Sequence, residues 1–394
     1  MAAAPAPGRR VVQQRVLMLL WLTAAAVGVG MAFTTVAPNR LLSGTGAGLA
    51  EVLQAGPVGW SLAWFGSAGV LAVAVFRPAG RRWHLAVLGS AGLWTVALLA
   101  LAGAEAARRA ATLPDIARVS LGGGFWCLLA LGGLMAAHAL QRLALPAACR
   151  LVVLVTLLLP PAALVGAGHL DALSLLKEHA NRREVFDAAA LQHLQIVGIS
   201  LACALLVGVP LGLAAARSAR LARPLFAVLN VVQTVPSIAL FALLMAPLAA
   251  LAAWLPWLPV RGIGLWPAVI ALSLYALLPV VHGVVAGLAS VPAAVLEAAD
   301  GMGLSRRQRL RQVELPLALP VWLSGLRVTV VQLIGLAAVA ALIGAGGFGA
   351  LMFQGLFSSA IDLVLLGVLP VVALALVADA AFAAWVAAVE SRVS

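Results

Sequence analysis

The chain has 394 residues, of which 64% are apolar and only 10% are charged, and its net charge is +12. Soluble globular proteins are about half apolar and about a quarter charged, so this composition excludes a soluble enzyme and predicts an integral membrane protein. The positive charge would also suit a nucleic-acid-binding protein, but the arginines lie in short gaps between apolar runs rather than in one patch. That distribution is typical of arginines that flank membrane spans, and we expect no nucleic-acid partner.

Ten apolar runs of near-spanning length predict an all-α polytopic membrane protein with about ten transmembrane helices. The first five belong to a predicted N-terminal membrane domain, residues 1–168, and the last five to a second domain, residues 191–384. The predicted helices cover residues 16–36, 58–76, 83–104, 119–140, 151–168, 194–215, 225–252, 265–289, 321–346 and 363–386.

Charge predicts the orientation of these spans. Arg9, Arg10 and Arg15 precede the first run, which has the spanning length of about 20 residues and is longer than the core of a secretion signal. We therefore expect it to be a retained first helix. With the N-terminus in the cytoplasm, most of the 25 lysines and arginines fall in cytoplasmic segments, as the positive-inside rule requires. Both termini are then cytoplasmic.

The longest polar connection separates the two predicted domains at residues 169–190. Across residues 169–193, carboxylates outnumber lysines and arginines by one. A net negative charge suits the outer side of the membrane, so we expect this connection to be periplasmic.

A polar segment, residues 290–320, lies between two apolar runs and contains four arginines. Pro292 suits the first turn of a helix, because its missing N–H needs no partner there. We expect that helix to end at Gly301-Met302-Gly303, where glycine tolerates a left-handed turn. An ordered polar element between spans favours a docking element for a soluble partner at the membrane surface. The alternative is an amphipathic helix held to anionic lipid headgroups.

A second short helix is expected to follow. Ser305 and Gln308 have the spacing of a capping box, which predicts its start. We expect it to run through about Val313, with Pro316 and Pro320 closing it before the next span. The two helices then form a helix–turn–helix at the cytoplasmic surface.

The spacing of this segment resembles the EAA loop of bacterial ABC importer permeases, whose pattern is EAA-x3-G-x9-I-x-L-P. The matching residues are Glu297, Ala298, Ala299, Gly303, Val313, Leu315 and Pro316. Only Val313 departs, conservatively, from the isoleucine of the pattern. The resemblance implies that this is the coupling loop that inserts into a separate ATPase subunit, and that the second domain is a type I ABC importer transmembrane domain.

Further segments resemble one branch of these permeases, the importers of the osmoprotectants glycine betaine, choline and carnitine. They are residues 198–200, 208–212, 233–237, 274–279, 313–320 and 341–347. The extra N-terminal spans are similar to those of a longer subgroup of the same branch. After Pro279 the branch usually has Arg-Asn-Thr, whereas this chain has His282-Gly283-Val284. An amino acid or another small solute therefore stays open as an alternative cargo.

The resemblance also implies partners: ABC ATPase subunits, a periplasmic or lipid-anchored solute-binding protein, and a second permease copy or a related permease. It places the chain in the bacterial inner membrane. No cofactor is expected in the chain itself, because the only lysine, Lys177, follows leucine and cannot complete the Gly-Lys-Ser/Thr of a phosphate-binding loop. ATP is then used by the partner subunits. A membrane enzyme is disfavoured, since no nucleophile–base or metal constellation appears, and no metal site is expected.

Polar side chains inside spans are costly and mark candidate positions on a transport pathway. The densest set surrounds Pro236, which would free a backbone carbonyl that only protein or a water-filled cavity can satisfy. The predicted pathway residues are Asn230, Gln233, Thr234, Pro236, Ser237, Tyr275 and Gln332. The alternative is that these side chains pack the bundle through interhelical hydrogen bonds. His193 and His282 are expected to line the pathway or to pack, rather than to bind metal.

The second domain is expected to lack a carboxylate in the middle of a span. Asp362 and Asp379 lie near the ends of predicted spans, and Arg327 lies near a cytoplasmic end. A proton- or sodium-coupled transporter usually needs such a group. An ion-coupled secondary transporter is therefore the less favoured alternative, and the energy is expected to come from a separate ATPase.

Overall fold

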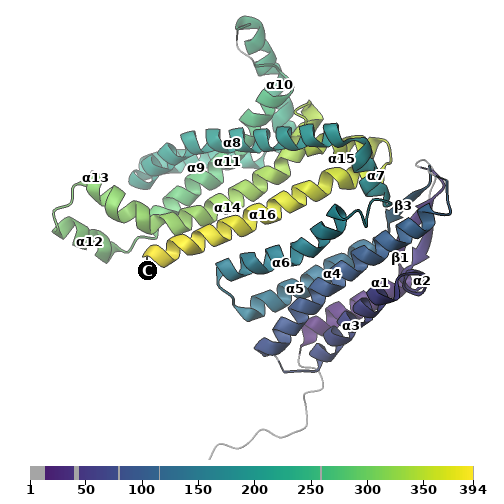
Figure 1. The fold of residues 1–394 in the computed structure, drawn as a ribbon. Coiled ribbons are helices and arrows are strands. Elements are labelled where there is room, and N and C mark those ends of the chain that lie inside the picture. Colours follow the sequence, from purple (N-terminus) through teal and green to yellow (C-terminus); the bar gives the residue numbers. More distant parts are fainter. Residues whose placement is uncertain (1–13, 40–43, 79, 115, 258–259, 394) are drawn as a thin grey trace, which may run out of the picture. The chain divides into compact units, whose positions relative to one another are not determined.

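The computed structural model describes residues 14–39, 44–78, 80–114, 116–257 and 260–393. Arg9 and Arg10, which the sequence places before the first span, lie outside these described residues. The chain divides into two compact units, the first ending at Ala180 and the second beginning at Asn181. Helices dominate both units (Figure 1).

The first unit combines helices with one small sheet (Figure 1). Its helices are α1 (Arg15–Gly30), α2 (Leu49–Ala55), α3 (Val58–Val75), α4 (Arg81–Ala110), α5 (Gly123–Leu143), α6 (Ala147–Gly166) and α7 (Ser174–Asn181). Its strands are β1 (Ala32–Ala37), β2 (Thr45–Gly48) and β3 (Arg118–Leu121). The order is β2-β1-β3, and both pairs are antiparallel.

The apolar run expected to be the first span, 16–36, is helical only as far as Gly30. Thr34, Thr35 and Val36 lie in β1 and pair with both neighbouring strands. Consecutive β-branched residues favour extended backbone, and hydropathy does not distinguish them from residues of a helix. Helix α1 therefore has 16 residues, fewer than the about 20 that span a bilayer.

The core of the first unit lies along α4. Trp94 on α4 donates from Nε1 to the carbonyl of Leu128 on α5, at 3.1 Å. A Cβ at Gly132 would lie 2.8 Å from the Trp94 ring, so glycine allows α4 and α5 to approach closely. Trp64 on α3 packs against the same indole, with ring centroids 5.1 Å apart. Aromatic packing thus joins three helices of this unit.

A buried carboxylate lies near the end of α4. Glu105 is 1% exposed and accepts hydrogen bonds from Arg108 and Arg109, with the shortest distance 2.7 Å in each case. Because all three residues lie within about one helical turn, the helix satisfies this charge by itself. Helix α4 therefore continues to Ala110, beyond the predicted end of its span at 104.

Among its described residues, the second unit contains helices joined by loops and no strand (Figure 1). Its α-helices are α8 (Arg183–Arg217), α9 (Ala219–Thr234), α10 (Ser237–Trp254), α11 (Leu265–Ala289), α12 (Ala293–Gly301), α13 (Arg306–Arg309), α14 (Leu315–Val339), α15 (Phe348–Phe357) and α16 (Ile361–Val393). A π-helical turn, Leu310–Glu314, joins α13 to α14, and a 3-10 turn, Ala340–Ile343, follows α14.

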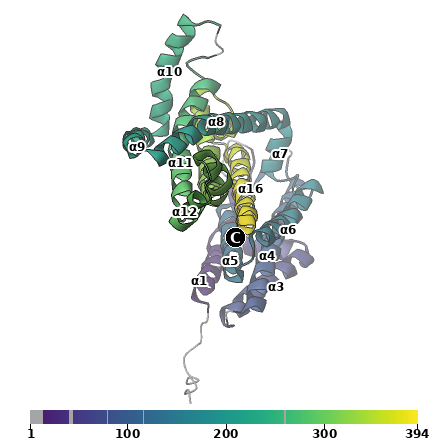
Figure 2. The same ribbon diagram turned by 90° about the vertical axis from the view of Figure 1, so that its left-hand side faces the viewer.

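Helix α11 is central to the second unit and packs against both α8 and α14, while α14 packs against α16. Two glycine contacts bring these helices close together. A Cβ at Gly212 of α8 would lie 2.7 Å from the Cβ of Val284 on α11, and a Cβ at Gly325 of α14 would lie 3.3 Å from the Cα of Gly283. Helix α10 extends away from this bundle in both views (Figure 1, Figure 2).

The span predicted at 225–252 is two helices. Helix α9 ends at Thr234, and Val235 has extended backbone with φ −70° and ψ 127°. Pro236 has no N–H to donate and disfavours helical backbone in the residue before it, so the break falls at this pair. The sequence predicted that Pro236 disturbs the hydrogen bonds of this span. It did not predict that the span is divided into two helices.

Nine helices of the described residues are long and apolar enough to cross a membrane. Helices α1 and α15 are apolar but shorter. The predicted all-α polytopic membrane architecture is confirmed, with the three-stranded sheet as an addition that apolar periodicity does not reveal.

Candidate coupling hairpin and translocation cavity

The polar segment folds into two short helical arms, and we call residues 292–316 the polar hairpin. Helix α12 begins directly after Pro292 and ends at Gly301. Gly303 takes φ +75°, and its N–H donates to the carbonyl of Asp300 at 3.0 Å. A left-handed residue after a helix is the usual role of glycine at a helix end, so the predicted stop signal is present.

The second arm begins with the predicted capping box. The N–H of Ser305 donates to Gln308 Oε1 at 2.9 Å, and the N–H of Gln308 donates to Ser305 Oγ at 3.4 Å. These two bonds satisfy N–H groups that have no partner inside the helix. They fix the start of α13 at Arg306.

Arg309 joins the two arms of the polar hairpin. It donates from Nη1 to Asp300 in the first arm at 2.7 Å and from Nε to Glu314 in the second arm at 2.8 Å. Two charge-assisted bonds from one planar group hold a more definite geometry than a single exposed ion pair. Sequence reasoning counted Arg309 as one of four similar arginines. The signal that singles it out is the pair of carboxylates nine residues before and five residues after it.

Pro316 does not close the second arm, contrary to the prediction. In the π-helical turn before it, the N–H of Leu315 donates to the carbonyl of Leu310, five residues back. Proline is tolerated at the first positions of a helical segment, because its missing N–H needs no partner there. Pro320 likewise lies inside α14. The chain therefore passes from the hairpin into the span as one continuous helix.

The seven residues that match the EAA pattern fall into two groups. Glu297, Ala298 and Gly303 are exposed, whereas Ala299 beside them is only 1% exposed. The second group lies where the second arm joins α14, and consists of Val313, Leu315 and Pro316. The first group provides a surface that another protein can reach, and the second fixes that surface to a membrane-spanning helix.

A cavity of about 420 Å³ lies between α9, α11 and α14, and we call it the polar cavity. Its volume falls in the range of about 300–1,000 Å³ that small-molecule sites occupy. Gly283 and Gly325 form its wall where α11 and α14 cross. Its polar lining residues are Asn230, Gln233, His282 and Gln332. None of the described residues that line it is an aspartate, glutamate, lysine or arginine.

Three of the seven predicted pathway residues line this cavity, namely Asn230, Gln233 and Gln332. Tyr275 does not, because it is 5% exposed and its hydroxyl donates to the carbonyl of Val235 at the break between α9 and α10. Gln233 Nε2 donates to the carbonyl of Tyr275 at 2.6 Å. Tyr275 thus holds the broken span against α11.

The remaining predicted pathway residues, Thr234, Pro236 and Ser237, lie at the helix break and are not among the residues that line the polar cavity. The Thr234 hydroxyl donates to the carbonyl of Val231 at 2.7 Å, so its hydrogen bond stays within its own helix. The sequence prediction grouped these residues with Asn230 and Gln233 because they are near along the chain, whereas only Asn230 and Gln233 of this group line the polar cavity.

An ion pair within the bundle joins Arg327 to Asp379, one of the carboxylates that the sequence places near the end of a predicted span. Asp379 lies near the middle of α16 and accepts hydrogen bonds from Arg327 Nε at 2.5 Å and Nη2 at 2.6 Å. Helix α14 begins before its predicted span and α16 extends beyond both ends of its predicted span, so each residue lies farther from its nearest helix end than expected. A carboxylate paired in this bidentate way lacks the free charge that ion coupling uses.

A bundle with a polar cavity between its helices, and a polar hairpin continuous with one of them, defines a membrane transport protein of the permease class. Residues 208–394 match the family model described as binding-protein-dependent transport system inner membrane component. Residues 12–176 match the model described as ABC transporter permease YehY, N-terminal domain.

Curated relatives match the chain over about half its length. The osmoprotectant import permease protein OsmW of Salmonella typhimurium is 44% identical over 188 residues, which are 48% of this chain and 84% of that protein. The glycine betaine/carnitine/choline transport system permease protein OpuCD of Bacillus subtilis is 38% identical over 179 residues, which are 45% of this chain and 72% of that protein. In a solved structure of the MetNI methionine ABC transporter in an inward-facing conformation, the matching chain is 23% identical, with a TM-score of 0.48. That match covers 53% of this chain and 98% of the other.

The chain belongs to the family of binding-protein-dependent transport system inner membrane components. It is a multi-pass permease subunit of an ABC importer in an inner membrane.

Proposed function

We propose that this chain carries a compatible solute, such as glycine betaine or another quaternary ammonium compound, through the membrane. The observation that supports this most is the polar cavity, whose polar groups are three amides and one imidazole without a charged side chain. A zwitterion carries both charges, so a fixed charge would retain one end of it, whereas neutral hydrogen-bonding walls let it pass. The relatives OsmW and OpuCD are named for osmoprotectants and for glycine betaine, carnitine and choline.

The lining of the polar cavity suits both ends of such a solute. The side-chain amides of Asn230, Gln233 and Gln332 offer N–H donors to a carboxylate. Phe226 and His282 form an edge-to-face pair with ring centroids 6.2 Å apart, and both line the cavity. An aromatic face attracts a quaternary ammonium group without a full opposing charge.

The polar hairpin would couple this cavity to separate ATPase subunits. In this proposal the exposed Glu297, Ala298 and Gly303 contact the ATPase, and both chain termini lie with the hairpin in the cytoplasm. A displacement of α12 would pass through the two ion pairs of Arg309 to the π-helical turn. From there it would enter α14, the helix that carries Gln332 at the cavity.

The other partners follow from the same proposal. A periplasmic or lipid-anchored solute-binding protein would deliver the solute, and a second permease copy or a related permease would complete the channel. Residues 191–384 would form the transporting domain, with residues 169–190 in the periplasm and residues 1–168 as a separate membrane domain.

Uptake of radiolabelled glycine betaine at low and high osmolarity tests the proposal. It is compared between a strain that lacks this chain and the same strain complemented with the chain. We expect uptake to require the chain and to stop when ATP is depleted. Uptake that survives ATP depletion but collapses with an uncoupler would show a secondary transporter instead. Uptake of an amino acid in place of betaine would replace the proposed cargo.

A variant of the polar cavity adds a structural test. Gln332→Leu removes an amide from the wall and should lower uptake about tenfold, since a hydrogen bond to a charged group contributes about 1.5–3 kcal/mol. Gln354→Leu makes the same chemical change outside the cavity, where Gln354 Oε1 accepts from Arg182 at 3.3 Å. Equal uptake by the two variants would remove Gln332 from the pathway.

A further inference from the structure

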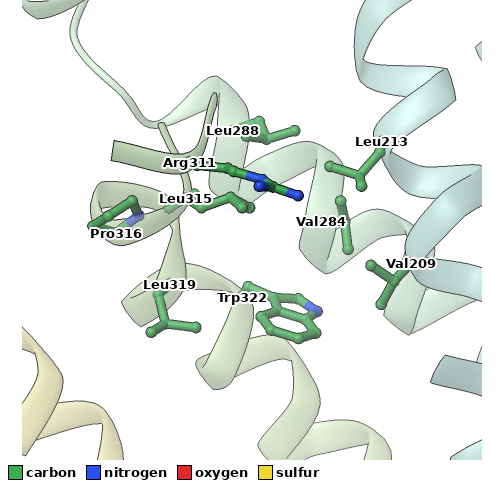
Figure 3. Close-up of a pocket in the computed structure, with 10 residues that line it drawn as sticks. Val209, Leu213, Val284, Leu288, Arg311, Leu315, Pro316, Leu319 and Trp322 are labelled. Carbon is green, nitrogen blue, oxygen red and sulfur yellow. The ribbon is translucent and has the colours of Figure 1, made fainter. Parts of the chain in front are cut away.

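A second cavity of the second unit lies beside the polar hairpin, and we call it the Arg311 cavity. It has a volume of about 370 Å³ and lies between α8, α11, α14 and the π-helical turn. Its walls are almost entirely apolar (Figure 3). The lining residues that Figure 3 labels are Val209, Leu213, Val284, Leu288, Arg311, Leu315, Pro316, Leu319 and Trp322.

One charged group reaches this apolar space. The guanidinium of Arg311 extends over the cavity from the π-helical turn, toward Leu213 and Val284 (Figure 3). Among the described residues, none forms an ion pair or hydrogen bond with it, in contrast to Arg309 two residues earlier. The indole Nε1 of Trp322 is buried, so among the described lining residues Arg311 supplies the polar side chain that a molecule in the cavity can reach.

The position of the cavity along the helix indicates its surroundings. Arg311 lies in the polar hairpin, and Leu315, Leu319 and Trp322 belong to the first apolar turns of α14. Arginine at such a junction lies at the level of lipid headgroups, while apolar side chains below it lie at the level of acyl chains. The cavity therefore combines a cation at headgroup depth with an apolar volume at chain depth.

We propose that the Arg311 cavity binds an acidic phospholipid, with its phosphate on the Arg311 guanidinium and part of one acyl chain between α8, α11 and α14. A transported zwitterion would leave the apolar walls without a partner, and a free phosphate would leave the cavity empty. The proposal does not depend on the nature of the transported solute. Because Arg311 belongs to the turn that joins the polar hairpin to α14, a lipid bound there would stabilise one position of the hairpin.

Native mass spectrometry of the purified, delipidated full-length chain tests the proposal with three probes. They are dioleoylphosphatidylglycerol, dioleoylglycerol with the same chains but no phosphate, and glycerol phosphate without chains. We expect a retained one-to-one adduct with phosphatidylglycerol alone. Equal retention of dioleoylglycerol would show that the cavity binds acyl chains without recognising the headgroup. Binding of glycerol phosphate would show an anion site that does not use the cavity, and either result would overturn the proposal.

Two variants and a control locate the bound lipid. Arg311→Gln should weaken phosphatidylglycerol binding about tenfold, since it removes a charge-assisted pair. Leu213→Trp should reduce it by filling the cavity. Arg307→Gln makes the same charge change in the same hairpin, at a side chain that does not line the cavity, and should leave binding unchanged. Equal loss in both arginine variants would mean general attraction to the hairpin, and loss of the adduct on addition of the ATPase subunits would assign the cavity to that partner.

Discussion

Each unit of this protein holds a carboxylate among apolar helices, and the two carboxylates are satisfied differently. Glu105 of the first unit takes its partners from its own helix, from Arg108 and Arg109. Asp379 of the second unit takes its partner from another helix, from Arg327, which lies 52 residues away in sequence. The Glu105 carboxylate is paired within about one turn of its own helix, whereas the pairing of the Asp379 carboxylate depends on the packing of α14 against α16.

The cavities of the two units also differ, in the polarity of their lining. The first unit has a cavity of about 290 Å³ whose lining is apolar and includes Trp21, Trp64 and Trp94. The second unit has cavities between helices that present amides or a guanidinium. The ion pair between α14 and α16 and the polar linings of these cavities lie in the second unit, so a relative movement of its helices would change its chemistry. The first unit is held by local charges and aromatic packing, and the following variants test this contrast.

The largest effect should come from the polar hairpin of the second unit. Gly303→Val should abolish uptake, because a β-branched residue at φ +75° costs about 1–3 kcal/mol and displaces the second arm. Gly301→Val is the matched control, since a Cβ at Gly301 meets nothing within 4 Å and its φ is not positive. Both variants should insert into the membrane, as fractionation would show. Full uptake by Gly303→Val would remove the hairpin from the coupling route.

In the first unit, Glu105→Gln should lower the free energy of unfolding by about 3 kcal/mol, because it breaks a pair in which the carboxylate is almost fully buried. Uptake per folded molecule should stay unchanged, since the partners of Glu105 among the described residues belong to its own helix. Denaturation of the purified chain in detergent, together with uptake normalised to folded protein, measures both quantities. A loss of normalised uptake would show that Glu105 also contributes to transport, and the two units would then not differ in this respect.

Asp379→Asn should lower the free energy of unfolding by less, about 2 kcal/mol, because its carboxylate and the Arg327 guanidinium are 43% and 39% exposed. Here normalised uptake should also fall, since the pair holds α16 against the helix that carries the polar cavity. The reversed pair, Arg327→Asp with Asp379→Arg, should recover part of both losses. An unchanged uptake in Asp379→Asn would assign this ion pair to stability alone.

The smallest effect is expected at the capping box. Ser305→Ala removes the acceptor for the Gln308 N–H and should cost about 1 kcal/mol of local helix stability. Hydrogen exchange should report faster opening of α13 while the spans stay protected. Arg306→Ala, in the first turn of α13 but outside the capping box, provides the control. Equal exchange in the two variants would show that the two ion pairs of Arg309 alone hold the second arm.

Local chemistry made several features of this chain predictable. Apolar runs of spanning length predicted a polytopic helical membrane protein, and the Ser305–Gln308 spacing and Gly303 predicted the capping box and the helix end of the hairpin. Each signal acts over fewer than about 20 consecutive residues, because a helix satisfies its own backbone hydrogen bonds. The family was also visible at this level, because the spacing of its loop pattern belongs to one continuous segment.

Tertiary packing decided the rest. Apolar periodicity is the same for Thr34, Thr35 and Val36 in a helix or a strand, and only pairing with β2 and β3 made them part of a sheet. The pairing of Arg327 with Asp379, and the presence of Gln332 but not Ser237 in the lining of the polar cavity, depend on helices meeting across many residues of sequence. The amino-acid sequence by itself thus determined where most of the helices lie and which segments are polar. Only the packing of α8, α11, α14 and α16 determined which polar groups face each other, because contacts between helices depend on crossing geometry and not on spacing along the chain.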